Sequence, residues 1–142
     1  MKKYLWSLCF VAVGITIGFW VGRATPTEAA MAGRVFELRT YHTEEGKLPD
    51  LQARFRNHTT KIFAKHGMTN IGYWVPQDEP TSKNTLIYML AYPNREAAKK
   101  SWEAFRNDPE WKKVREASEA NGKIVNKVES VFMDATDYSK IK

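Results

Sequence analysis

The sequence predicts an α+β fold, a four-stranded antiparallel sheet in the ferredoxin-like order β-α-β-β-α-β. Residues 35–41 alternate between apolar and polar side chains, and residues 85–92 are apolar at nearly every position, as in strands that pack against other layers. Between and after these segments, apolar residues recur at threes and fours, which is the period of a helix with one buried face. Right-handed crossovers place both helices on one face of the sheet.

The first strand has two distinct faces and leads directly into the first helix. One face holds Phe36, Leu38 and Thr40, and the other holds Val35, Glu37, Arg39 and Tyr41. A turn at residues 44–46 is followed by Pro49, which suits the first turn of a helix because its missing N–H is not needed there. The helix ends at Gly67. Its inner stripe is predicted to hold Leu48, Leu51, Phe55, His58, Ile62 and His66.

The second half of the domain contributes three strands and a helical segment. Strands are predicted at residues 68–75, 85–92 and 124–133, and a polar loop follows Pro76. The second helix starts after Asn94, a residue that accepts hydrogen bonds well at a helix N-terminus. Asp108-Pro109 predicts a restart into a further short helix that ends at Asn121-Gly122.

Both predicted helices cover the same side of the sheet, so the other side needs a different cover. We assign the face with Val35 and Tyr41 to this uncovered side, together with alternate residues of strand 85–92. Such a face exposes more apolar surface than a monomer normally tolerates. The sequence therefore predicts a homodimer in which this face meets its own copy.

Residues 1–24 are predicted to be a signal peptide or an N-terminal transmembrane anchor. Lys2 and Lys3 precede about 17 uncharged residues, from Leu5 to Val21. A signal peptide would use the small residues around Met31 for cleavage, whereas glycines repeated every fourth residue favour a retained helix. Both interpretations place the domain on the non-cytoplasmic, periplasmic side, either membrane-anchored or secreted. Residues 25–33 are predicted to be a linker, and residues 34–142 a single domain.

Composition excludes several kinds of site. The chain has 142 residues and a formal charge of +6, and its single cysteine, Cys9, lies in the apolar leader. The domain therefore has no thiol for catalysis or metal binding. Lysines and glutamates alternate at helical spacing, as on a solvated helix face, and no concentrated basic patch predicts a nucleic-acid partner. The spacing of ligand-type residues predicts no metal, and no motif predicts a cofactor.

Short motifs across residues 34–142 resemble one known family. They are Phe36-Glu37-Leu38-Arg39-Thr40-Tyr41, Arg54-Phe55 with His58, Lys65-His66-Gly67-Met68, Ile71-Gly72-Tyr73-Trp74, Asn84 with Tyr88, Ser101-Trp102 with Phe105, Asp108-Pro109-Glu110-Trp111 and Val128-Glu129-Ser130. Together they resemble the NIPSNAP family. The resemblance implies a dimeric α+β barrel, in which two ferredoxin-like subunits set their sheets face to face.

What the resemblance implies about activity is limited. Eukaryotic members of the family are associated with mitochondria and with vesicle or mitophagy interactions, whereas bacterial members are largely uncharacterised. The basic and apolar leader of this sequence is more similar to a bacterial export signal than to a transit peptide. Related barrels include cofactor-free monooxygenases, haem-degrading enzymes and small isomerases, but this similarity concerns the fold.

Glu37 and Arg39 are the first candidates for chemistry. Both are predicted to face the barrel interior, where a charge is costly unless it is paired. In one interpretation Arg39 holds an anionic or carbonyl group while Glu37 accepts a proton. In the other, the two form a structural ion pair that locks the dimer. His58 is the third catalytic candidate, as a proton carrier or axial haem ligand, with a hydrogen-bonded core histidine as the alternative.

Aromatic side chains from the strands define the predicted ligand site. Its residues are Arg39, Tyr41, Tyr73, Tyr88 and Tyr92. An interior lined in this way suits a flat organic ligand and suits a dry dimer core equally well.

Two functions follow from these residues. The first is an exported or membrane-anchored homodimer that binds a small ligand or a protein partner through its barrel or surface. The alternative is a cofactor-free monooxygenase- or isomerase-like enzyme that uses acid-base groups in the barrel.

Overall fold

The computed structural model of the chain describes residues 33–141. The predicted leader, residues 1–24, and nearly all of the predicted linker lie outside the described residues. Within the described part, no helix has the length and apolar character needed to cross a lipid bilayer.

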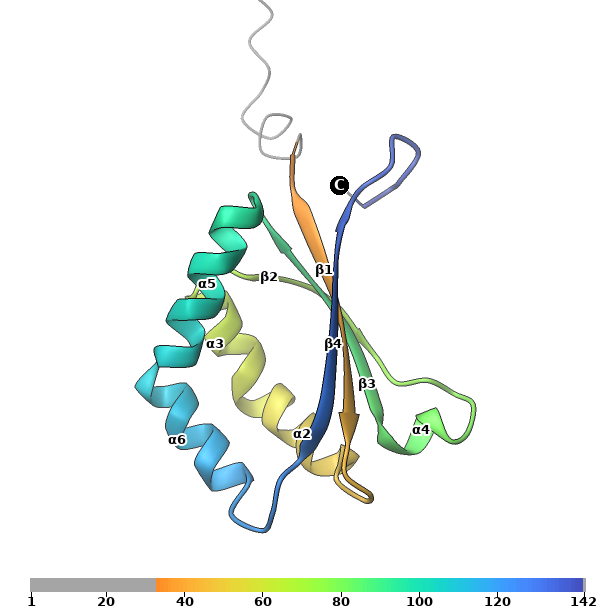
Figure 1. The fold of residues 1–142 in the computed structure, drawn as a ribbon, viewed down its shortest axis with the longest axis vertical. Helices are drawn as coiled ribbons and strands as arrows, with labels where there is room; N and C mark the ends of the chain where they lie inside the picture. The colour runs from red at the N-terminus through yellow and green to blue at the C-terminus, as the bar shows by residue number, and fades with distance from the viewer. Residues whose placement is uncertain (1–32, 142) are drawn as a thin grey trace, which may run out of the picture.

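The order of elements agrees with the prediction, with one short helix added before the third strand (Figure 1). The elements are β1 (Val35–Thr43), α2 (Leu48–Arg54), the π-helical segment η1 (Phe55–Thr59), α3 (Thr60–Lys65), β2 (Thr69–Trp74), α4 (Thr81–Asn84), β3 (Thr85–Tyr92), α5 (Arg95–Asn107), α6 (Pro109–Ser118) and β4 (Val125–Asp134). The added helix α4 lies in the segment predicted to be a polar loop.

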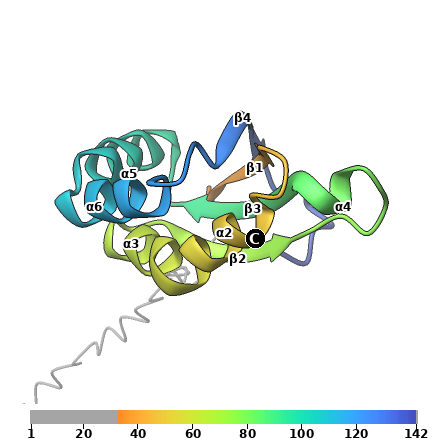
Figure 2. The ribbon, with the colours of Figure 1, turned by 90° about the horizontal axis from the view of Figure 1, so that it is seen from below.

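The strands form one 4-stranded sheet in the order β2-β3-β1-β4, and each neighbouring pair is antiparallel. The segment α2-η1-α3 and the helices α5 and α6 lie on the same side of this sheet (Figures 1 and 2). The predicted ferredoxin-like α+β fold is therefore confirmed. As expected for a chain with right-handed crossovers, the other side of the sheet carries no long helix.

The helices cover the face of β1 that we predicted to be bare. Trp102 on α5 donates a hydrogen bond to the Glu37 carboxylate at 2.6 Å, and the Phe55 ring lies 6.0 Å from that of Tyr41. The prediction that Val35, Glu37, Arg39 and Tyr41 face a barrel interior is therefore wrong. Alternation defines two faces but does not say which one the helices cover, and Glu37 and Arg39 neutralise each other well enough to lie under the helices.

The uncovered face carries the other set of β1 residues. Leu38 is paired in register with Met89 on β3 and with Val131 on β4, so these side chains project to the same side. Val131 is 55% exposed and Trp74, at the end of β2, is 51% exposed. An apolar band without a helix therefore crosses the sheet, on the side opposite to the one assigned from the sequence.

Aromatic rings make up much of the core between the sheet and the helices. The Phe63 ring lies 5.4 Å from Trp102 and 4.8 Å from Phe105, and the Phe55 ring lies 5.1 Å from Tyr88. Trp102 and Phe105 of α5 both point inward and are buried. Ring pairs at these separations add to the apolar burial that joins the two layers.

Both predicted helix starts have the expected side-chain caps. Asn94 accepts a hydrogen bond from the Ala97 N–H at 2.8 Å, and α5 begins at the next residue. Asp108 accepts one from the Glu110 N–H at 2.7 Å, and α6 begins at Pro109. Each cap satisfies a backbone donor that the helix itself cannot pair.

The first helix contains one π-helical turn, η1. Thr59 donates its hydroxyl to the Arg54 carbonyl at 3.2 Å, and Thr60 donates to the Phe55 carbonyl at 3.2 Å, so each spans five residues along the helix. A wider turn shifts the helix phase, so that Thr59 is buried and His58 is exposed. The predicted inner position of His58 is therefore wrong, because the prediction assumed an unbroken α-helical period.

Candidate functional site

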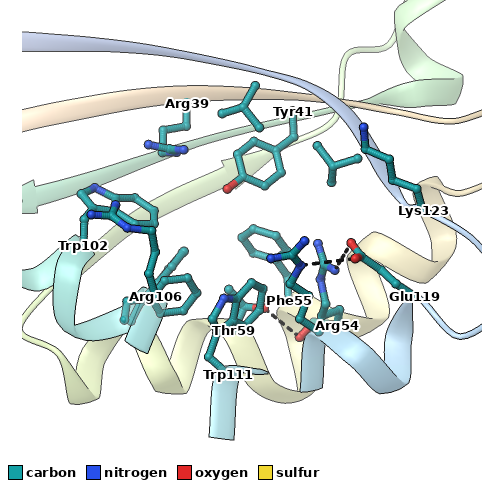
Figure 3. Close-up of a pocket in the computed structure, with 15 residues that line it drawn as sticks. Arg39, Tyr41, Arg54, Phe55, Thr59, Trp102, Arg106, Trp111, Glu119 and Lys123 are labelled. Carbon is teal, nitrogen blue, oxygen red and sulfur yellow. Dashed lines mark hydrogen bonds and ion pairs between the residues drawn. The ribbon is translucent and has the colours of Figure 1, made fainter. Parts of the chain in front are cut away.

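A cleft of about 380 Å³ opens between the helix-covered face of the sheet and the helices (Figure 3). Arg39 and Tyr41 point into it from the sheet, and Arg54 and Trp111 point into it from the helices. We call it the aromatic cleft, because its walls contain the rings of Tyr41, Phe55, Phe63, Trp102, Phe105 and Trp111. Its position between two layers of the fold is a common one for a small-molecule site.

The aromatic cleft is strongly cationic. Its basic side chains are Arg39, Arg54, Arg106, Arg115 and Lys123, and its only carboxylate is Glu119. Glu119 is already ion-paired, with Arg54 at 3.2 Å and with Arg115 at 3.3 Å. Because basic side chains outnumber carboxylates in the lining, the cleft favours a negatively charged ligand.

Arg54 is the most deeply buried cation of the cleft, with only 4% of its side chain exposed. One terminal nitrogen donates to the Ser118 hydroxyl and to Glu119, each at 3.2 Å. The guanidinium lies 5.3 Å from the centre of the Trp111 ring. Its Nε–H has no partner in the described part of the chain, which is unusual for a buried donor.

Arg39 is held firmly at the opposite wall. One terminal nitrogen lies 2.6 Å from the Glu37 carboxylate, and the guanidinium lies 4.2 Å from the centre of the Trp102 ring. Among residues 33–141 its buried Nε also finds no partner. A guanidinium that is stacked on a ring and fixed at one end presents its remaining N–H groups in a fixed direction.

The Glu37 carboxylate is saturated with donors. Besides Arg39, it accepts hydrogen bonds from Tyr92 at 2.7 Å, from Trp102 at 2.6 Å and from Ser130 at 2.6 Å. Burial raises the pKa of Glu37, but the hydrogen bonds and Arg39 outweigh burial and hold this pKa below its ordinary value of 4.5. These contacts join β1, β3, β4 and α5, and they match the interpretation of Glu37 as a structural partner rather than a proton acceptor.

The predicted tyrosines share the helix-covered face but differ in access. Tyr41 lines the aromatic cleft, whereas Tyr88 and Tyr92 have no exposed surface. Tyr73 stacks on Tyr88 with ring centres 5.5 Å apart, and its hydroxyl donates to Asn70. The structure thus brings Arg39 and Tyr41 together at the cleft and places Tyr73, Tyr88 and Tyr92 in the packing behind it.

The Tyr88 hydroxyl is a further buried group without a hydrogen-bond partner among the described residues. Burial and the neighbouring Tyr41 raise the pKa of Tyr88 well above its ordinary value, so this hydroxyl stays protonated at neutral pH. It can therefore act as a donor, but it is not a base.

The histidines lie away from the aromatic cleft. His58 lines a separate groove between α2 and α6, and His42 belongs to β1, where its ring lies 3.3 Å from Glu129. His66 caps the end of α3 and contacts the Asp108 carboxylate at 2.5 Å. Residues 33–141 contain no group of three or more histidine, cysteine or acidic side chains that could hold a metal.

Sequence reasoning missed most of the cations in the cleft. Arg54, Arg106, Arg115 and Lys123 were not predicted as site residues. Arg54 follows Leu51 by three residues, so its place on the inner face of the helix could have been read from the period. The other cations have no such signal, because they lie on helix surfaces and loops that fold over the cleft.

The model of the NIPSNAP family matches residues 36–140. The chain belongs to the NIPSNAP family. The match covers all the strands and helices named above except Val35, the first residue of β1, so the aromatic cleft lies inside the NIPSNAP domain. No curated protein matches the sequence.

Solved structures of other NIPSNAP proteins share the fold. A NIPSNAP family protein from Agrobacterium tumefaciens (Atu5224) is 21% identical, with 77% of this chain and 99% of that chain covered and a TM-score of 0.67. Another from the same organism (Atu4242), described as having unknown function, is 17% identical over 78% of this chain and 95% of that chain, with a TM-score of 0.66.

The fold also extends beyond NIPSNAP proteins. SnoaB, a cofactor-independent oxygenase from Streptomyces nogalater, is 11% identical over 76% of this chain and 98% of that chain, with a TM-score of 0.52. At such low identity the likeness concerns the fold, not the reaction.

Proposed function

We propose that this NIPSNAP domain binds a small organic anion with a flat ring in the aromatic cleft. The observation that carries the proposal is the combination of six aromatic rings with five basic side chains and a single carboxylate around one cavity. Rings favour a flat apolar body, and the excess of cations favours an acidic group on it.

Fixed cations at the cleft support the same proposal. The guanidinium groups of Arg39 and Arg54 are held against the rings of Trp102 and Trp111 respectively. Little side-chain entropy is therefore lost at these residues when a ligand binds.

Binding fits these residues better than catalysis. The oxygenase or isomerase alternative needs a group that removes a proton from the substrate. Glu119, the carboxylate that lines the cleft, is ion-paired with two arginines, and Glu37 is saturated with donors. The resemblance to SnoaB keeps the enzyme as the second candidate, and oxygen uptake in the presence of a bound aromatic anion would support it.

We propose that the domain acts as a homodimer. The uncovered face with Leu38, Met89 and Val131 supports this, because apolar bands of this kind on a sheet normally have a cover. The basic and apolar start of the sequence supports the further proposal that residues 1–24 export the domain or anchor it in a membrane. A protein partner at the surface remains the alternative to a small ligand.

A fluorescence titration with 8-anilinonaphthalene-1-sulfonate, an aromatic anion, tests the binding proposal on residues 33–142. We expect saturable binding of one probe per subunit, and Trp111→Leu should weaken it about tenfold by removing a ring from the cleft. Tyr138→Ala is the control, because Tyr138 is 83% exposed and does not line the cleft. The proposal fails if the natural sequence does not bind the probe, or if a folded Trp111→Leu variant binds it unchanged.

A further inference from the structure

A second pocket, of about 470 Å³, adjoins the aromatic cleft. It lies between the start of α5 and the edge strand β4, and its lining includes Arg95 and Lys99 from the helix and Ser130 and Phe132 from the strand. We call it the basic pocket. Arg39, Trp102 and Arg106 line both spaces, so the basic pocket and the aromatic cleft meet at these side chains.

Three of the four cations of the basic pocket have no ion-pair partner among residues 33–141, whereas the fourth, Arg39, is paired with Glu37. Within residues 33–141, Arg95, Lys99 and Arg106 form no ion pair, whereas Lys47, Lys65 and Lys127 elsewhere on the domain each contact a carboxylate. The acidic residues that line the pocket are Glu37 and Glu96. The charge of Glu37 is already committed to Arg39 and three hydrogen bonds, so the surplus positive charge faces the pocket.

The positive charge of residues 33–141 is concentrated at these two spaces. Together they are lined by seven cationic side chains and three carboxylates. This excess of four exceeds the net charge of +3 that residues 33–141 carry, from 18 lysines and arginines against 15 aspartates and glutamates. Field lines gather in a cleft with low-dielectric aromatic walls, which raises the local concentration of an anion.

Two of these cations are preorganised by stacking. The guanidinium of Arg95 lies 3.4 Å from the centre of the Phe132 ring, and that of Arg39 lies 4.2 Å from the centre of the Trp102 ring. Stacking on a ring uses the flat face of a guanidinium and leaves its N–H edge for an oxyanion. Arg95 and Lys99 are one helical turn apart on α5, so they can approach the same acidic group.

We infer that the ligand is an elongated aromatic oxyanion, with its ring in the aromatic cleft and its acidic group held in the basic pocket by Arg95, Lys99 and Arg106. This inference rests on the proposed function of the cleft. It adds the class of ligand, a ring joined to a carboxylate, sulfonate or phosphate, and it assigns the recognition of the acid to residues that do not line the aromatic cleft, Arg95 and Lys99.

Two probes with the same ring system test whether the ring and the acidic group are bound in different places. 8-Anilinonaphthalene-1-sulfonate carries an acid, and N-phenyl-1-naphthylamine is its neutral counterpart. We expect the natural sequence to bind the anionic probe at least tenfold more tightly. The double variant Arg95→Ala/Lys99→Ala should lose most of this preference and bind the neutral probe unchanged, because the ring site is intact.

The control is Lys100→Ala/Lys112→Ala, which removes the same charge from exposed helix positions outside both spaces. The inference is overturned if Arg95→Ala/Lys99→Ala keeps the preference for the anionic probe, or if it weakens both probes equally. A different result would show that the ring does not bind in the aromatic cleft, which would contradict the proposed function. In that case Trp111→Leu would leave the affinity for the neutral probe unchanged, whatever the result at Arg95 and Lys99.

Discussion

Glu37 illustrates how one charged residue can be buried in a small domain. It is 1% exposed, yet every lone pair it offers has a donor within reach, and Arg39 supplies the opposite charge. The cost of removing a carboxylate from water is large, and such an arrangement offsets it. The residue therefore stabilises the wall that holds Arg39 rather than taking part in binding directly.

Glu37→Gln should destabilise the domain by about 3 kcal/mol at neutral pH, because Arg39 would keep its buried charge without a partner. Urea unfolding followed by circular dichroism measures the change. Glu103→Gln, at an exposed position of α5, is the control and should change the free energy of unfolding by less than about 0.5 kcal/mol. Equal stability of the two variants would contradict the role given to Glu37.

The lowered pKa of Glu37 also predicts a dependence on pH. Because this pKa in the folded protein lies below the ordinary 4.5, the charged form contributes its full stabilisation above that pH and loses it as the pH falls. The difference in unfolding free energy between the natural sequence and Glu37→Gln should therefore shrink as the pH falls below 4.5. A difference that grows over this range would contradict the direction of the shift.

At the scale of elements, the junction between α5 and α6 depends on Asp108. Its carboxylate caps α6 and also contacts His66 at 2.5 Å and Lys65 at 2.8 Å at the end of α3. The hydrogen bonds from Lys65 and His66 hold the pKa of Asp108 well below its usual range. The motif Asp108-Pro109 thus begins α6 and also joins α6 to the end of α3.

Asp108→Ala should lower the melting temperature more than Asn94→Ala does. Loss of the Asn94 cap removes one backbone hydrogen bond, worth about 1 kcal/mol. Loss of Asp108 removes a cap of the same kind, leaves His66 without its carboxylate partner and leaves Lys65 with Glu110 alone. Thermal unfolding of both variants at pH 7 makes the comparison, and equal losses would mean that the contacts with α3 add nothing.

The element scale also shows what the sequence could and could not predict. Strand 85–92 and the starts of α5 and α6 were predicted correctly, because apolar continuity and capping residues are local signals. The inward position of His58 was wrong because a π turn changes the helix phase without a clear residue signature. The cleft cations were missed because their convergence depends on how α6 and the loop to β4 fold over the sheet.

For the whole molecule, the main correction concerns the two sides of the sheet. Both sides carry apolar side chains on β1 and β3, and alternation alone gave no reason to prefer one for the helices. The proposed site lies with the helices on the side of Arg39 and Tyr41. The surface proposed for pairing with a second copy lies on the side of Leu38 and Val131.

Val131→Asp should convert the proposed dimer into a monomer, because it places a charge in the apolar band that the second copy would cover. Val128→Asp is a matched control on the same strand, since Val128 pairs with Tyr41 and therefore projects to the opposite side. Light scattering coupled to size exclusion, at micromolar concentration, reads out the mass. A natural sequence that is already monomeric would refute the proposed dimer.

The alternation along β1 has a practical consequence for changing this protein. Positions 39 and 41 of the strand border the aromatic cleft, and positions 38 and 40 project to the side of the apolar band. Libraries confined to positions 39 and 41 would thus vary the proposed ligand site and leave the surface of the proposed dimer intact, and libraries confined to positions 38 and 40 would do the reverse. The two faces of β1 can therefore be changed independently of each other.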